Sequence, residues 1–144
     1  MSDEVTQVSL HKQAKYPHMF PHDISIWERF LDTNGAEYIL FDYDIKVGTG
    51  VPAEPSLPEN YIHMQDTLSK LRIDCVGFRA SSIDIIEVKP NASISAIGQL
   101  MSYVELYKRD FQPSAPVRGV LVTDRELPDI KHLTEAHGFG YYIV

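Results

Sequence analysis

The stretch from Arg72 to Lys89 constrains the fold more than any other part of the chain. It reads RIDCVGFRASSIDIIEVK, which is two apolar, β-branched runs separated by the short polar turn RASS. Such runs predict two antiparallel strands joined as a hairpin. The second run carries Glu87 and ends in Lys89, although a charge taken out of water costs several kcal/mol unless something compensates it. Whatever group compensates the charge of Glu87 could therefore belong to a functional site.

Further elements are expected on both sides of this hairpin. Apolar residues at helical spacing predict three helices, over 24–35, 94–111 and 126–138. Alternating or unbroken apolar runs predict three more strands, over 37–48, 117–124 and 139–144. The proline-rich stretch 49–60 is expected to form a loop that continues as an irregular connection. This order predicts an α/β fold in which helices flank a mixed sheet on both faces.

Size and composition fit one globular domain with a negative net charge. The chain has 144 residues, a formal net charge of -7 and a single cysteine, Cys75, so no intramolecular disulfide framework can form. The charge disfavours a nonspecific nucleic-acid binder, because binding to phosphates normally rests on a surplus of Lys and Arg. It leaves room for a nuclease whose acidic groups are neutralised by a metal ion. No membrane-spanning run is present, and a cytoplasmic location is expected.

The N-terminal residues differ in composition from the remainder. After a polar start they read HKQAKYPHMFPHD, which predicts an extended arm over 1–22 and a domain over 23–144. The apolar side chains of the arm, Tyr16, Met19 and Phe20, are expected to pack or to bind a partner. His18 and His22 have the spacing of a helical zinc site, but the intervening Pro21 argues against a regular helix there, and no metal role is expected for them.

Acidic side chains on the two hairpin strands suggest a metal site. Side chains alternate along a strand, so Glu87 and Lys89 share one face, and Asp74 lies on the adjacent strand within cross-strand reach. Two carboxylates and a backbone carbonyl such as that of Val88 form the oxygen-rich set that Mg²⁺ prefers. Lys89 could then orient an attacking water or stabilise charge on a phosphate.

These residues resemble the PD-(D/E)xK, or restriction endonuclease-like, nuclease superfamily, whose core has the order αβββαβ. The resemblance rests on Asp74, on Glu87-x-Lys89 and on the following helix, which carries Gln99 and Tyr103 in the spacing QxxxY. It implies that Asp74 and Glu87 bind Mg²⁺ or Mn²⁺, that Lys89 serves the attacking water, and that Gln99 and Tyr103 support the site or touch DNA. The last helix and strand would be additions to this core.

A closer resemblance involves the first helix. The pairing of SIWERF with a later EVKP is similar to transposase-end nucleases and phage head-completion nucleases. In such members a glutamate of the first helix joins the metal site, and Glu28 is the position that matches it. This resemblance implies a phage or mobile-element origin.

Three hypotheses for the function follow. The first is a metal-dependent DNA endonuclease that hydrolyses phosphodiester bonds. The second is a structural component of a phage particle, acting in head completion or at the neck and docked on a ring by its N-terminal arm, which would place the protein in a virion. The third is a nuclease subunit that acts only with a recombination or repair partner, from which it would borrow its affinity for DNA.

Overall fold

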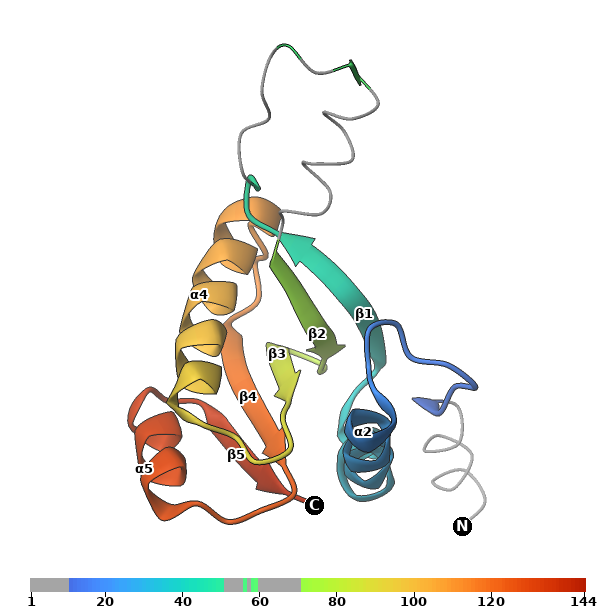
Figure 1. The fold of residues 1–144 in the computed structure, drawn as a ribbon, viewed down its shortest axis with the longest axis vertical. Coiled ribbons are helices and arrows are strands. Elements are labelled where there is room, and N and C mark those ends of the chain that lie inside the picture. The colour runs from blue at the N-terminus through green and yellow to red at the C-terminus, as the bar shows by residue number, and fades with distance from the viewer. Residues whose placement is uncertain (1–10, 51–55, 57, 60–70) are drawn as a thin grey trace.

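The computed structural model describes residues 11–50, 56, 58–59 and 71–144. In this part of the chain one sheet holds five strands, in the spatial order of the sequence: β1 (Leu40–Val47), β2 (Leu71–Phe78), β3 (Ile83–Val88), β4 (Val117–Thr123) and β5 (Gly140–Ile143). The first three strands are antiparallel, and β3, β4 and β5 run parallel (Figure 1). The predicted α/β fold with a mixed sheet is confirmed.

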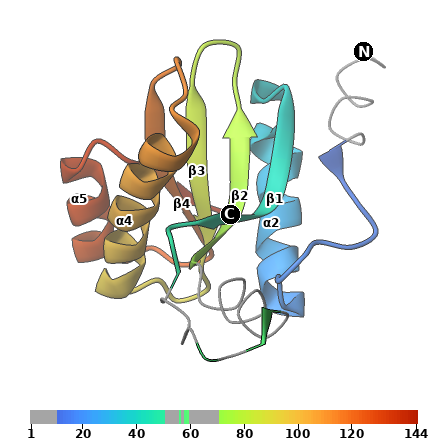
Figure 2. The same cartoon turned by 90° about the horizontal axis from the view of Figure 1, so that it is seen from above.

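Helices cover both faces of this sheet. Helix α2 (Pro21–Asn34) lies on one face, and α4 (Ile94–Phe111) and α5 (Pro128–Ala136) lie on the other (Figure 2). Each face has its own apolar core. Under α2 the rings of Trp27 and Phe30 pack with Ile86 of β3, whereas Ile85 packs in the core under α4. Neighbouring residues of β3 thus point to opposite faces, as the alternation of a strand requires.

The element bounds follow the sequence pattern closely, with one informative difference. Strand β2 and helix α4 span the predicted residues, while α2 begins at Pro21. Proline suits the first position of a helix, because the N–H it lacks would have no partner there. The Asp23 carboxylate also accepts a hydrogen bond from the backbone N–H of Phe20 at 3.1 Å, which closes the first turn. The predicted proline-rich loop lies largely outside the described residues.

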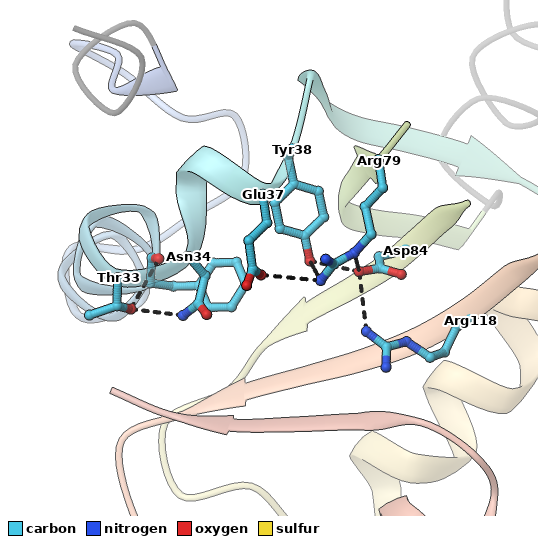
Figure 3. A network of polar contacts seen from close by, with 8 residues as sticks. Thr33, Asn34, Glu37, Tyr38, Arg79, Asp84 and Arg118 are labelled. Carbon is cyan, nitrogen blue, oxygen red and sulfur yellow. Dashed lines mark hydrogen bonds and ion pairs between the residues drawn. The ribbon is translucent and has the colours of Figure 1, made fainter. Parts of the chain in front are cut away.

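Strand β3 holds a buried acid, Asp84, at the hairpin end of the sheet, and a polar network compensates its charge (Figure 3). Asp84 is 1% exposed, and its Oδ2 accepts hydrogen bonds from the Tyr38 hydroxyl at 2.6 Å and from Arg79 Nε at 2.9 Å. Arg118 of β4 lies 3.5 Å from the same oxygen. Burial, reinforced by Asp84, raises the pKa of Tyr38 far above its ordinary value, so its hydroxyl stays protonated and donates. This acid therefore has a structural role.

Within the described residues, no helix combines the length and the apolar run that crossing a bilayer would require.

Candidate active site

The site lies at the end of the sheet opposite the hairpin turn, where strand β2 begins and strand β3 ends. The ladder between these strands stops at the pair Cys75 and Ile86. Beyond this pair, the two strands are linked by hydrogen bonds from backbone N–H groups to side-chain carboxylates. The N–H of Asp74 donates to Glu87 Oε1 at 3.4 Å, and the N–H of Val88 donates to Asp74 Oδ2 at 3.0 Å. The two strands separate, and the gap between them holds both carboxylates.

The apolar packing shows the same break. Ile73 packs in the core under α4, whereas Cys75 packs in the core under α2. Residues two apart in a regular strand point to the same face. The alternation of β2 is therefore interrupted at Asp74, which lies between them. This irregularity turns the Asp74 carboxylate toward the end of β3.

Burial gives the carboxylate pair unusual electrostatics. Glu87 is 2% exposed, and burial, followed by the charge of Asp74, raises its pKa well above the usual range. Burial also raises the pKa of Asp74. Among the described residues, the basic group that meets the pair is Lys89, whose Nζ lies 3.8 Å from Glu87 Oε2 while its side chain remains 38% exposed. Two acids beside one lysine leave the site short of positive charge.

Helix α4 brings Tyr103 to the same site. Burial, followed by the charges of Glu87 and Asp74, raises the pKa of Tyr103 to about 12, so the phenol is protonated at neutral pH. Gln99 lies one turn earlier on the same helix face. Within the described residues its Oε1 is buried and has no hydrogen-bond partner. A buried amide oxygen without a donor is costly, and it points to a ligand or a water at this place.

The donor set fits a hard divalent cation. The two carboxylates of Asp74 and Glu87 are oxygen donors, which Mg²⁺ and Mn²⁺ prefer over nitrogen and sulfur, and the Val88 carbonyl stays a predicted ligand. In the part of the chain that the structure describes, no three His, Cys, Asp or Glu side chains converge. Such a sparse set suits Mg²⁺, which keeps several waters and needs few protein ligands.

Glu28, the metal ligand predicted on the first helix, contacts the N-terminal arm. Glu28 accepts a hydrogen bond from the Tyr16 hydroxyl at 3.5 Å, on the side of α2 that meets the arm. The α2 carboxylate that acts on Asp74 is Asp23, whose charge contributes to the raised pKa of Asp74. No local pattern indicates its proximity to β2, because that depends on how α2 crosses the sheet. A metal role for Glu28 stays a prediction.

Two histidines without an expected role hold the segment that enters α2. His18 Nε2 lies 3.2 Å from Asp44 Oδ2 of β1, and Arg72 Nη1 reaches the same oxygen at 2.9 Å. At the other end of the segment, His22 Nε2 lies 3.0 Å from Asp124 Oδ2, directly after β4. Residues 18–22 are thus held on both sides of the Asp74 and Glu87 pair. We call them the 18–22 segment.

The fold and the site define a nuclease-like α/β domain of the PD-(D/E)xK type, with paired acids and a lysine at the ends of two inner strands of a mixed sheet. The model of the family "Endonuclease NucS C-terminal domain" matches residues 67–142, and the chain belongs to this family. No curated protein matches the sequence.

The fold is similar to that of a solved structure. It is the crystal structure of a repair endonuclease from Pyrococcus abyssi, with a TM-score of 0.50 and 18% sequence identity. The likeness covers 91% of this chain and 49% of that chain, so this chain spans about half the length of that repair endonuclease. The predicted restriction endonuclease-like fold is confirmed, and the chain is an endonuclease-family domain.

The closer resemblance to transposase-end and phage head-completion nucleases has no support. Neither the family nor the solved structure points to those nucleases. The hypotheses of a phage origin and of a phage particle component rested on that resemblance, and they have no support from these likenesses either.

Proposed function

We propose that this chain is a DNA endonuclease that uses Mg²⁺ or Mn²⁺ to hydrolyse phosphodiester bonds. The observation that carries the proposal is the pair of buried carboxylates, Asp74 and Glu87, set side by side with a shortage of positive charge around them. A bound cation would supply that charge and would polarise the scissile phosphate. Membership of an endonuclease family supports the same reaction.

The residues of this site would divide the work. Asp74, Glu87 and the Val88 carbonyl would hold the cation. The Lys89 ammonium is close to Glu87 yet reaches solvent, so it can orient the attacking water and stabilise the negative charge that develops on the phosphate. Tyr103, protonated at neutral pH, and Gln99 would donate or accept hydrogen bonds at the α4 side of the site. In-line displacement at phosphorus needs such positioning more than it needs a covalent step.

DNA repair is the setting that we propose for this reaction. The Pyrococcus abyssi protein is a repair endonuclease, and the family is named for an endonuclease. The net charge of -7 is unfavourable for tight DNA binding by this chain alone. A basic partner protein, or a further domain, would raise the local concentration of DNA at the site. Cleavage is therefore expected to increase when such a partner is added.

The test is cleavage of labelled single-stranded, duplex and branched DNA in Mg²⁺ or Mn²⁺. We expect the wild type to cut at least one of these substrates, and Lys89→Ala to lower the rate by about 100-fold or more, the range typical of a positioned acid–base group. Lys46→Ala, which removes an exposed lysine of β1, is the matched control and should retain the wild-type rate. Equal rates for wild type and Lys89→Ala, or no cleavage of any substrate with either metal, would refute the proposal.

A further inference from the structure

A histidine and an aspartate form a pair beside the candidate site. His22 Nε2 lies 3.0 Å from Asp124 Oδ2, and the His22 side chain is 58% exposed, whereas that of Asp124 is 21% exposed. An exposed ion pair contributes little to the free energy of folding, so stability alone gives a weak reason for this contact. The imidazole of His22 is fixed at one nitrogen and still accessible to a ligand.

Asp124 places this pair at the Lys89 end of the site. It directly follows β4, which runs parallel to β3 with Val122 beside Val88. The backbone N–H of Lys89 donates to the Val122 carbonyl at 2.9 Å. Two residues further along, the N–H of Asn91 donates to Asp124 Oδ1 at 3.4 Å. Asp124 is therefore held against the part of the chain that carries Lys89.

His22 reaches the same place from the other side, on α2. It is the second residue of that helix and directly precedes Asp23, whose charge acts on Asp74. The 18–22 segment thus brings the imidazole between the acid that acts on Asp74 and the end of β4. Three chain segments meet at this point: the start of α2, the residues after β3 and the residue after β4.

Asp124 also determines which imidazole nitrogen carries the hydrogen. Although burial acts in the opposite direction, hydrogen bonds from the N–H groups of Asn91 and of Asp124 itself, and from His22, lower the pKa of Asp124. An ionised carboxylate can only accept hydrogen bonds, so His22 Nε2 is the donor in this contact. Nδ1 is then the nitrogen that can exchange a proton with a ligand.

We propose that His22 is a further catalytic residue, the general acid that donates its Nδ1 proton to the leaving oxygen, and that Asp124 is its positioning residue. This inference rests on the proposed function, which places a phosphodiester at Asp74 and Glu87 and assigns the attacking water to Lys89. The attacking and leaving oxygens lie roughly in line on opposite sides of phosphorus, so one side chain cannot serve both. The leaving oxygen therefore needs a proton donor of its own.

The proposed step is a proton transfer that accompanies the cleavage of the ester bond. The water oxygen forms a bond to phosphorus and releases one proton to solvent. The P–O ester bond breaks, its electron pair stays on the leaving oxygen, and this oxygen takes the Nδ1 proton of His22. The neutral imidazole regains a proton from solvent before the next turnover. A positioned general acid of this kind contributes about 100- to 10,000-fold to a rate.

The experiment separates proton donation from a merely structural contact. His22→Gln keeps an N–H donor for Asp124, but its amide cannot protonate an alkoxide. His18→Gln is the matched control, because it makes the same change at the other end of the 18–22 segment, where His18 contacts Asp44. Asp124→Asn removes the charge that orients the imidazole.

Cleavage in Mn²⁺ is measured on a DNA that the wild type cuts, and on the same DNA with sulfur in place of either bridging oxygen of the scissile phosphate. A thiolate leaves without being protonated, so sulfur at the leaving position removes the need for a general acid. Calorimetric titration of Mn²⁺ and NMR of the histidine ring nitrogens in the metal-free protein give two readouts that do not depend on cleavage.

We expect His22→Gln to lower the rate on the oxygen substrate by about 100-fold or more, and by less than about threefold on one of the two sulfur substrates. Asp124→Asn should show a smaller loss with the same recovery, and His18→Gln should cut every substrate as the wild type does. Mn²⁺ affinity should be unchanged in His22→Gln. The NMR spectrum of the wild type should place the hydrogen of neutral His22 on Nε2.

Equal rates for wild type and His22→Gln on the oxygen substrate would overturn the inference and leave the proposed function standing. A loss that sulfur restores at neither position, or a loss of the same size in His18→Gln, would assign His22 to holding the segment and would also overturn it. The same holds for a fall in Mn²⁺ affinity in His22→Gln or a hydrogen on Nδ1 in the NMR spectrum. A wild type that cuts no DNA would refute the proposed function, and this inference with it.

Discussion

At the scale of single residues, the buried acids of β3 show two different uses of a charge inside a sheet. Asp84 is satisfied by Tyr38 and Arg79, so its charge is compensated within the protein. Glu87, on the opposite face, has another acid as its neighbour and a raised pKa. Burial and the Asp74 charge favour the neutral form of Glu87 in the metal-free protein, whereas a bound cation would favour the charged form. The contrast between the two acids is the physical argument for a cation at Glu87.

Replacing Glu87 by Gln should stabilise the metal-free protein while abolishing cleavage. The folded pKa of Glu87 lies above the unfolded value, so its contribution to stability is full below the ordinary carboxyl range and is lost as pH rises through the folded pKa. Without metal at pH 8, Glu87→Gln should raise the Tm by about 3 °C, and the difference should shrink toward pH 4. Thermal melts at both pH values in EDTA measure this.

The exposed Glu105 of α4 is the matched site for this experiment. Glu105→Gln makes the same chemical change outside the site and should leave both the Tm and the cleavage rate close to those of the wild type. A Glu87→Gln protein that melts below the wild type at pH 8 in EDTA would contradict the interpretation of Glu87 as an uncompensated buried charge.

At the scale of elements, the site depends on strands that separate and on helices that start beside them. The β2 and β3 ladder ends at Cys75 and Ile86, and the carboxylates fill the gap. The other end of the same hairpin is held tightly, because the Tyr38 ring lies against Gly77 of β2 and Arg79 lies 4.4 Å above that ring. The sheet is thus closely packed at the hairpin end, whereas at the site end the ladder stops and the side chains of Asp74 and Glu87 bridge the two strands.

Gly77→Ala should destabilise the fold without touching the chemistry. A Cβ at this position would lie 2.7 Å from the Tyr38 ring, which the bond to Asp84 prevents from moving away. We expect a loss of about 2 kcal/mol in the free energy of unfolding by denaturant titration, the scale of an overpacked core. Gly98→Ala in α4 is the control, since a Cβ there has no neighbour within 4 Å. It should stabilise by about 0.5 to 1 kcal/mol, because Ala favours a helix. Equal stability of the two variants would argue against the close approach of Tyr38.

Elements with a local signal could be read from the sequence, and contacts between distant elements could not. The spacing of apolar residues predicts the hairpin and α4, and the alternation along β3 predicts that Glu87 and Asp84 face opposite ways. The start of α2 at Pro21 also has a local cause, because proline suits the first position of a helix and the Phe20 N–H donates to the Asp23 carboxylate. The contact between His22 and Asp124 joins residues 102 positions apart, and no pattern within a window of either residue contains it.

At the scale of the whole molecule, the proposed endonuclease would have to engage a polyanion although its own net charge is -7. Its fold matches about half of a larger repair endonuclease. In the proposed mechanism two requirements are separate: the cation and Lys89 would meet the scissile phosphate, and a partner or further domain would supply general affinity for DNA. Each part of this division is carried by different residues, and each can be removed without the other.

Calorimetric titration of Mn²⁺ into the metal-free protein tests the central claim most directly, because it needs no knowledge of the DNA substrate. The wild type should bind the ion saturably, and Asp74→Asn should weaken binding by about tenfold or more, a loss of about 1.4 kcal/mol. Asp42→Asn, the same change at an exposed position of β1, should bind as the wild type does. Equal Mn²⁺ affinity in wild type and Asp74→Asn, or no binding to either, would contradict the claim that Asp74 and Glu87 form a metal site.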